Sequence, residues 1–173
     1  MADRAGDFHQ DALGHLDALY GFALFLTRNR PDADDLVQET YLRAFRFAHR
    51  FTPGTHLRAW LFQILRNTFL TFYRRASREL AILDKDWPDG EDGWALEAPP
   101  IPVGVAHDLG RALAELSEEF RSVLLLADLE EFALGEIAEI MDIPVGTVKS
   151  RLFRARRLLR RRLADYRPGG AAG

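Results

Sequence analysis

Apolar residues recur along most of the chain at the three- and four-residue spacing of an amphipathic helix, and no segment alternates as a strand does. In the first half, this spacing predicts helices over about 13–28, over 33–48, and from a Thr55 cap to the 74–80 region. The expected inward positions are Leu13, Leu16, Leu19 or Tyr20, Ala23 and Leu26; Leu36, Val37, Tyr41, Ala44, Phe45 and Ala48; and Leu57, Trp60, Leu61, Ile64, Leu65, Phe69 and Phe72. The pattern therefore indicates an all-α fold.

The second half has the same periodicity and contains a helix-turn-helix pattern. Leu109, Leu113 and Leu116 indicate a first helix, and Ser117-Glu118-Glu119 offers a cap for the next. Another helix, with apolar residues from Leu134 to Met141, is broken at 142–144. Because proline is tolerated in the first turn of a helix, the basic last helix can begin at about Pro144. Two short helices joined by a tight turn, the second one basic, are typical of helix-turn-helix domains.

The composition changes between these two helical regions. Residues 84–104 are rich in proline, glycine and acidic side chains and carry no helical periodicity. A stretch of this length is too long for an ordinary loop inside a compact domain. We therefore expect two small helical domains at 8–82 and 106–166, joined by a flexible acidic linker at 83–105.

The last predicted helix has two unlike faces. Residues 146–163 contain eight positive side chains and no negative one. Val145, Val148, Leu152, Ala155 and Leu159 fall on the side expected to face the core. The opposite side contains Lys149, Ser150, Phe153, Arg154, Arg157, Arg160 and Arg161. An exposed aromatic ring among arginines fits a DNA groove, where bases contact the ring and phosphates the arginines, and a solvated surface helix is the alternative.

Charge and composition narrow the classes of protein. The net charge is −3, but without the eight basic residues of 146–163 the remaining 15 basic residues stand against 26 acidic ones, a balance of −11. A basic element on an acidic body limits non-specific DNA binding. Cysteine is absent, which excludes a disulfide, a zinc–thiolate site and a thiol switch within the chain. With no apolar run near 20 residues and no signal peptide, we expect a cytoplasmic protein without membrane insertion.

A second basic stretch, RAWLFQILRNTFLTFYRRASRE, lies in the first domain. One side of this helix is expected to hold Arg66, Asn67, Phe69, Tyr73, Arg74 and Arg78. Aromatic rings interleaved with arginines and an amide are typical of single-stranded nucleic-acid binding. A place in the core is the alternative for Trp60 and Phe69.

An acidic cluster, Asp32, Asp34, Asp35 and Glu39, follows the first predicted turn. Carboxylates at a helix N-terminus complement its dipole, and no histidine or glycine-rich calcium loop accompanies them, so we expect no metal here. The polar face formed by Asp34, Asp35, Gln38 and Glu39 is suited to a basic helix of another protein. The histidines are scattered and no catalytic set is recognisable, so we expect neither a cofactor nor an enzyme.

Three segments, DADDLVQETYLRAF, LRAWLFQILRNTF and LGEIAEIMDIPVGTVKSRLFRARRLLRRRL, resemble the signature segments of the extracytoplasmic-function (ECF) sigma factors. They occur in the same order as in that family and span both domains. The resemblance implies a subunit that joins core RNA polymerase and directs it to promoter DNA. Its first domain would bind and open the minus-ten element, and its second would bind the minus-thirty-five element as duplex.

The resemblance also assigns residues. Polymerase contact is implied for Asp34, Asp35, Leu36, Gln38 and Glu39. A flipped-base pocket is implied at the RFTPGTHL loop and Asn67, and together with the basic aromatic helix the expected minus-ten surface is Arg50, Thr55, His56, Trp60, Arg66, Asn67, Tyr73 and Arg74. The expected upstream surface is Thr147, Lys149, Ser150, Arg151, Phe153, Arg154 and Arg157, with Arg151 and Arg157 near phosphates.

Within that family, FTPGTHLRAWLFQILRNTF is similar to members that respond to thiol or oxidative stress and are held by zinc-containing anti-sigma factors. The lack of cysteine would place any redox sensing on such a partner. Two other interpretations remain open at this point. An autonomous helix-turn-helix regulator leaves the first domain unexplained, and a metal-dependent nucleic-acid enzyme lacks its ligand set.

Overall fold

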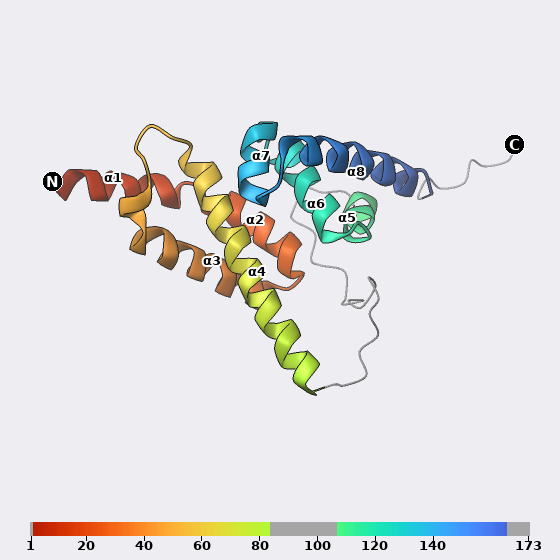
Figure 1. The fold of residues 1–173 in the computed structure, drawn as a ribbon, viewed down its shortest axis with the longest axis horizontal. Coiled ribbons are helices and arrows are strands. Elements are labelled where there is room, and N and C mark those ends of the chain that lie inside the picture. Colours follow the sequence, from red (N-terminus) through yellow and green to blue (C-terminus); the bar gives the residue numbers. More distant parts are fainter. Residues whose placement is uncertain (1, 84–106, 166–173) are drawn as a thin grey trace, which may run out of the picture. The chain divides into compact units, whose positions relative to one another are not determined.

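The computed structural model describes residues 2–83 and 107–165 (Figure 1). All regular structure in these two ranges is helical, which confirms the all-α expectation. The chain divides into two compact units, Met1–Glu97 and Ala98–Gly173. The predicted linker at 83–105 lies, beyond Leu83, outside the described residues.

The first unit contains α1 (Ala2–Leu13), α2 (Leu16–Thr27), α3 (Arg30–Arg46), the short 3-10 helix η1 (Ala48–Arg50) and α4 (Leu57–Leu83). Helices α2, α3 and α4 pack against one another (Figure 1). Their shared core consists of fully buried apolar side chains, including Leu19, Phe22, Leu36, Leu61, Phe62 and Leu65.

Local sequence sets the ends of α3 and α4. The Asn29 side chain accepts a hydrogen bond from the Asp32 N–H at 2.8 Å, and Pro31 occupies the first turn, where no N–H partner is required. The expected Thr55 cap of α4 is wrong. Thr55 Oγ1 donates to the Thr52 carbonyl at 2.7 Å, and α4 begins only after a turn in which Gly54 has a φ of 87°.

The first predicted helix is present as α2, but it begins at Leu16 rather than near Leu13, and a separate helix α1 precedes it. A break at Gly14-His15 separates α1 from α2, and it leaves Leu13 and Leu16 exposed at the turn rather than in the core. A side chain at position 14 would bring its Cβ to 3.2 Å from the Asp11 carbonyl oxygen, so glycine fits this turn. Phe72, also expected inward, is exposed on α4.

The second unit contains α5 (His107–Ala114), α6 (Glu118–Leu124), a π-helical turn η2 (Leu125–Leu129), α7 (Leu134–Met141) and α8 (Val145–Asp165). Helices α5, α6 and α7 all pack against α8. The α8 residues Val148, Leu152 and Ala155 are buried as predicted. Val145 is not, because it is the first residue of α8 and no preceding turn of that helix covers it.

The turn between α7 and α8 lies where proline and aspartate predict it. Asp142 adopts the left-handed conformation, with a φ of 53°, which aspartate tolerates better than most residues. The Ile143 N–H donates to the Ala138 carbonyl at 3.0 Å, and the Pro144 carbonyl accepts from the Val148 N–H at 3.1 Å. These bonds end α7 and start α8, so the helix-turn-helix prediction is confirmed.

Candidate nucleic-acid and polymerase interfaces

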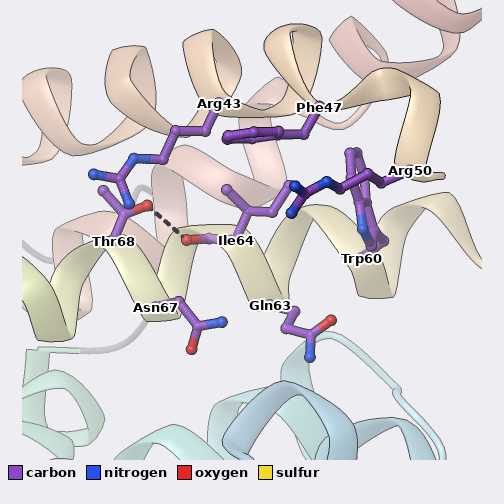
Figure 2. Close-up of a pocket in the computed structure, with 8 residues that line it drawn as sticks. All are labelled: Arg43, Phe47, Arg50, Trp60, Gln63, Ile64, Asn67 and Thr68. Atoms are coloured by element: carbon purple, nitrogen blue, oxygen red, sulfur yellow. Dashed lines mark hydrogen bonds between the residues drawn. The ribbon is translucent and has the colours of Figure 1, made fainter.

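An open cleft of about 360 Å³ lies between α3 and α4 in the first unit (Figure 2). It is lined by one residue of α3, the residue that follows α3, one residue of η1 and five of α4: Arg43, Phe47, Arg50, Trp60, Gln63, Ile64, Asn67 and Thr68. Figure 2 shows the ring of Phe47 on one side and the amides of Gln63 and Asn67 projecting from α4 away from α3. All eight residues line the same open cleft, with the ring of Phe47 on its α3 side and the two amides at its α4 margin.

Cations surround the ring of Phe47. The guanidinium carbon of Arg50 lies 4.9 Å from the ring centroid, and that of Arg46 lies 5.6 Å away. Arg43 Nε donates to Glu39 Oε1 at 2.6 Å within α3. The Thr68 hydroxyl donates to the Ile64 carbonyl at 2.7 Å, so it is engaged in its own helix. This arrangement is suited to binding a nucleotide, because a base can stack on an aromatic ring while nearby guanidinium groups attract its phosphate.

The structure brings together only part of the expected minus-ten surface. Arg50, Trp60 and Asn67 line the cleft, whereas Thr55 and His56 lie exposed in the preceding loop and do not line it. Arg66 is only 6% exposed, so its expected place on the outer side of α4 is wrong. Its position turns toward the packed side of the helix, beside the buried Leu65. The side chains of Tyr73 and Arg74 lie outside the described residues.

Sequence reasoning missed five of the cleft residues. They are Arg43, Phe47, Gln63, Ile64 and Thr68. A usable signal was present, because positions 60, 63, 64, 67 and 68 follow helical spacing on one side of α4. The contribution of α3 was not visible in that spacing, since it depends on which helix packs beside α4.

The outward face predicted for α8 is exposed in the second unit. Lys149, Ser150, Arg154 and Arg157 are all exposed, as are Arg160 and Arg161, and the Phe153 ring is 64% exposed. Thr147 is half-buried, and its carbonyl accepts a hydrogen bond from Ser150 Oγ at 3.1 Å. An exposed ring therefore stands among cations on one continuous helical surface.

Three other arginines of α8 form ion pairs with the body of the second unit. Arg151 pairs with Glu119 at 3.2 Å, Arg156 with Asp128 at 2.5 Å and Arg162 with Glu115 at 2.6 Å. The hydrogen bond from Arg156 to Asp128 raises the pKa of Arg156. Arg151 is thus half-buried against the Glu119 carboxylate, whereas we expected it on the phosphate-facing side. The basic residues of α8 therefore divide into two sets. The inner set pairs with carboxylates of the second unit and consists of Arg151, Arg156 and Arg162; the outer set consists of Lys149, Arg154, Arg157, Arg160 and Arg161.

The acidic face of α3 is partly as expected. Asp34, Asp35 and Gln38 are exposed, but Leu36 is 1% exposed and belongs to the core, so its assignment to a contact surface is wrong. Leu36 lies on the buried side of α3, the helix that packs against α2 and α4. Glu39 is about one third exposed and paired with Arg43. Leu42, one turn after Gln38, is 66% exposed and was not anticipated.

Within residues 2–83 and 107–165, no three histidine or carboxylate side chains are grouped closely enough to hold a metal ion. In the same two ranges, no helix combines the length and apolar character that crossing a membrane requires.

The sequence matches two known families in the order of its two units. Sigma-70 region 2 matches residues 13–79, and Sigma-70 region 4 matches residues 106–159. The ECF RNA polymerase sigma factor EcfG of Rhodopseudomonas palustris (strain TIE-1) is 39% identical over 150 residues, covering 84% of this chain and 79% of EcfG. The chain belongs to the ECF sigma factors.

Other relatives agree with this family. The ECF sigma factor SigE of Mycolicibacterium smegmatis is 37% identical over 161 residues, and the match covers 88% of this sigma factor but 60% of SigE. Among solved structures, RpoE in complex with the anti-sigma factor NepR from Bartonella quintana has a TM-score of 0.76 and 34% identity, covering 93% of this chain and 99% of RpoE. CnrH in complex with the cytosolic domain of CnrY has a TM-score of 0.66 and 26% identity, covering 96% of each chain.

Family membership decides between the interpretations that the sequence left open. A sigma factor is a transcription initiation factor rather than an enzyme, and both of its units are accounted for. The autonomous regulator explained only the second unit, and the metal-dependent enzyme had no ligand set.

Proposed function

We propose that the cleft of the first unit binds an unpaired base of the minus-ten element once the promoter has opened. The observation that carries this proposal is that Trp60, Arg50 and Asn67 all line one open cleft. A ring offers a stacking surface worth about 1–3 kcal/mol per base, and an amide adds hydrogen bonds that distinguish one base from another. Because a paired base cannot enter the cleft, this binding energy is available only after strand separation.

The exposed face of α8 is proposed to contact the minus-thirty-five element as duplex. Lys149, Ser150, Phe153 and Arg154 lie on the N-terminal half of α8, which is the part of a recognition helix that enters a major groove. Arg157 lies one turn beyond Phe153 and is assigned to phosphates. Thr147 and the paired Arg151 flank this surface and are assigned to its edge.

The acidic face of α3 is proposed to bind core RNA polymerase. Asp34, Asp35 and Gln38 offer two exposed carboxylates and an amide, which suit a basic helix on the partner. Leu42 adds an exposed apolar side chain on the following turn. Glu39 contributes at the margin, since its carboxylate already pairs with Arg43.

An anti-sigma factor is proposed to control this protein in the cytoplasm, where RNA polymerase acts. Two structural relatives were solved as complexes, RpoE with the anti-sigma factor NepR and CnrH with CnrY. The finer proposal is a zinc-containing anti-sigma factor that senses thiol oxidation, and it is supported by the resemblance of residues 51–69 to members of that type. Because this chain has no cysteine, the sensing would lie on the partner. Co-purification with reductant and with oxidant tests it, and a redox-independent complex would contradict the sensing role.

The test of the cleft is an Asn67→Ala holoenzyme on a promoter selected from a randomised duplex library. Loss of the amide should reduce open-complex formation roughly 5- to 150-fold, the equivalent of a base contact of about 1–3 kcal/mol. Closed-complex binding should stay unchanged. Permanganate footprinting of unpaired thymines measures the opening, and a template with a pre-melted bubble lacking the recognised base should relieve the defect.

Thr71→Ala is the matched control. Thr71 is an exposed polar residue one turn further along α4 and does not line the cleft. A cleft that binds a base should be sensitive to position 67 and insensitive to position 71. Normal opening by the Asn67→Ala holoenzyme, or an equal loss in both variants together with a lower melting temperature, would contradict the assignment.

A further inference from the structure

Helix α1 packs against the other helices of the first unit, although the region 2 match begins only at residue 13. Among the described side chains and backbone groups of α1, three residues on one side make contacts with other segments of the unit. The Ala12 carbonyl accepts a hydrogen bond from the Tyr41 hydroxyl at 2.8 Å, and the His9 ring lies 4.3 Å from the ring of Phe45. Phe8 makes the third contact, and this one involves Trp60, a residue that lines the cleft.

Phe8 completes a cluster of three aromatic rings drawn from three segments. Its ring centroid lies 5.7 Å from that of Phe51, in the loop after η1, and 6.2 Å from that of Trp60 on α4. The Phe51 and Trp60 centroids are 5.4 Å apart. The Phe8 and Trp60 rings meet edge to face at 67°, an arrangement that the ring quadrupoles favour.

The same indole lines the cleft. Trp60 is half-buried, so part of its ring packs in the cluster while another part borders the space shared with Arg50 and Asn67. Phe51 follows Arg50 directly in the chain, and its N–H donates to the Ala48 carbonyl at 3.0 Å. The cluster therefore fixes two cleft components, the indole of Trp60 and the backbone that carries Arg50.

We propose that Phe8 is a positioning residue for the cleft, holding Trp60 in the orientation that stacks on an unpaired base. The proposal rests on the proposed function of the cleft. A ring that is already ordered loses less conformational freedom when a base stacks on it, so a fixed Trp60 binds more tightly than a mobile one. Phe8 itself makes no contact with the base.

The experiment uses full-length sigma factor in a Trp87→Phe, Trp94→Phe background, in which Trp60 is the only tryptophan. Phe8→Ala should leave Trp60 mobile, which appears as faster decay of its fluorescence anisotropy in the free protein. In holoenzyme, Phe8→Ala should weaken binding of a labelled non-template-strand oligonucleotide from the selected promoter by about three- to tenfold. Affinity for core polymerase should not change, and Phe8→Tyr, which keeps the ring, should restore both measurements.

His9→Ala is the matched control, because the His9 ring contacts Phe45 at 4.3 Å and the edge of Phe8 at 6.0 Å but not Trp60, so its loss leaves the Phe8–Trp60 contact in place. It should leave the anisotropy of Trp60 and the oligonucleotide affinity unchanged. Unchanged affinity in Phe8→Ala would overturn the role of Phe8 while the cleft assignment stands. Equal losses in Phe8→Ala and His9→Ala, with weaker polymerase binding, would also overturn it and make α1 a structural support. If Trp60→Ala does not affect oligonucleotide binding, the proposed function of the cleft fails, and the role of Phe8 with it.

Discussion

The cleft of the first unit and the outward face of α8 are both assigned to DNA, yet they are built in different ways. The face of α8 comes from successive turns of one helix, so its members follow from an angle of about 100° per residue. The cleft joins residues from positions 43–50 and 60–68, which meet only because α3 and α4 pack together. One surface is local in sequence and the other depends on tertiary packing.

This difference has a mechanistic counterpart. Side chains on the exposed face of α8 are already available to duplex DNA, and each contributes its own contact. The cleft offers its binding energy only to a base that has left the stack, and its shape depends on neighbours such as Phe51 that do not line it. We therefore expect substitutions on α8 to act on binding one contact at a time and substitutions around the cleft to act on opening.

The largest expected effect comes from a charge reversal on the acidic face of α3, Asp34→Lys with Asp35→Lys. It should abolish the function of the cleft and leave that of the α8 face intact. Both carboxylates are exposed, so the fold should survive, while like charges facing a basic partner can cost several kcal/mol. Polymerase association, measured by gel filtration, should be lost, and promoter opening through the cleft should be lost with it. Binding of the free chain to minus-thirty-five duplex should remain.

Asp7→Lys with Asp17→Lys provides the matched control for that reversal. It makes the same change in net charge at two exposed positions of the first unit outside α3. Holoenzyme assembly should be near normal in this variant. Intact assembly by the α3 variant, or equal loss in both, would remove the acidic face of α3 from the polymerase interface.

The next largest effects concern the outward face of α8, and they test whether its residues act separately. Arg154→Ala should cost about 1–3 kcal/mol at the cognate element and relax sequence preference there. Arg157→Ala should weaken binding to all duplexes similarly and reduce the slope of log affinity against log salt by about one. Titrations of cognate and scrambled duplexes at several salt concentrations measure both, and indistinguishable losses would place both arginines on phosphates.

The sequence predicted the α8 region well because its determinants are local. Pro144 and Asp142 mark the turn, and the buried Val148 and Leu152 follow from helical spacing, as does the exposed ring of Phe153. Ion pairing was not predictable in the same way. Arg151 turns inward because Glu119 lies beside it on α6, and neither position carries a signal of that partner.

The cleft was predicted only in part, because packing between helices decides its composition. Asn67 and Trp60 were found from chemistry and spacing on α4, but Phe47 enters from the end of α3. Arg66 carries a charge suited to DNA contact, yet its position on α4 buries it. The contact of Phe8 with Trp60 spans about fifty positions of sequence, and no periodic pattern connects residues that far apart.

A smaller effect is expected from Tyr41→Phe, which tests how much the contact between α3 and α1 contributes to stability. Tyr41 is buried, and its hydroxyl donates to the Ala12 carbonyl, so its loss should lower the free energy of unfolding by about 1 kcal/mol. Burial also raises the pKa of Tyr41 from 10.0 to about 12. The unfolded chain therefore ionises first as pH rises, and stability should fall between about pH 10 and 12. Urea unfolding across this pH range should show a smaller fall in the free energy of unfolding for Tyr41→Phe than for the unchanged protein. An identical pH dependence in both proteins would exclude Tyr41 as the source of the fall.

The smallest expected effect tests whether the inner and outer cations of α8 are separate sets. Arg156 and Asp128 are about half exposed, with side-chain exposures of 49% and 45%, so their pair should contribute only about 0.2–1 kcal/mol to unfolding. A double-mutant cycle of Asp128→Ala, Arg156→Ala and the double variant measures that coupling, which salt should weaken. If Arg156 belongs to the inner set, Asp128→Ala should leave the salt slope of duplex binding unchanged. A slope steeper by about one would mean that Arg156, once released from Asp128, contacts a DNA phosphate. Arg156 would then belong to the outer set whenever its pairing with Asp128 is lost.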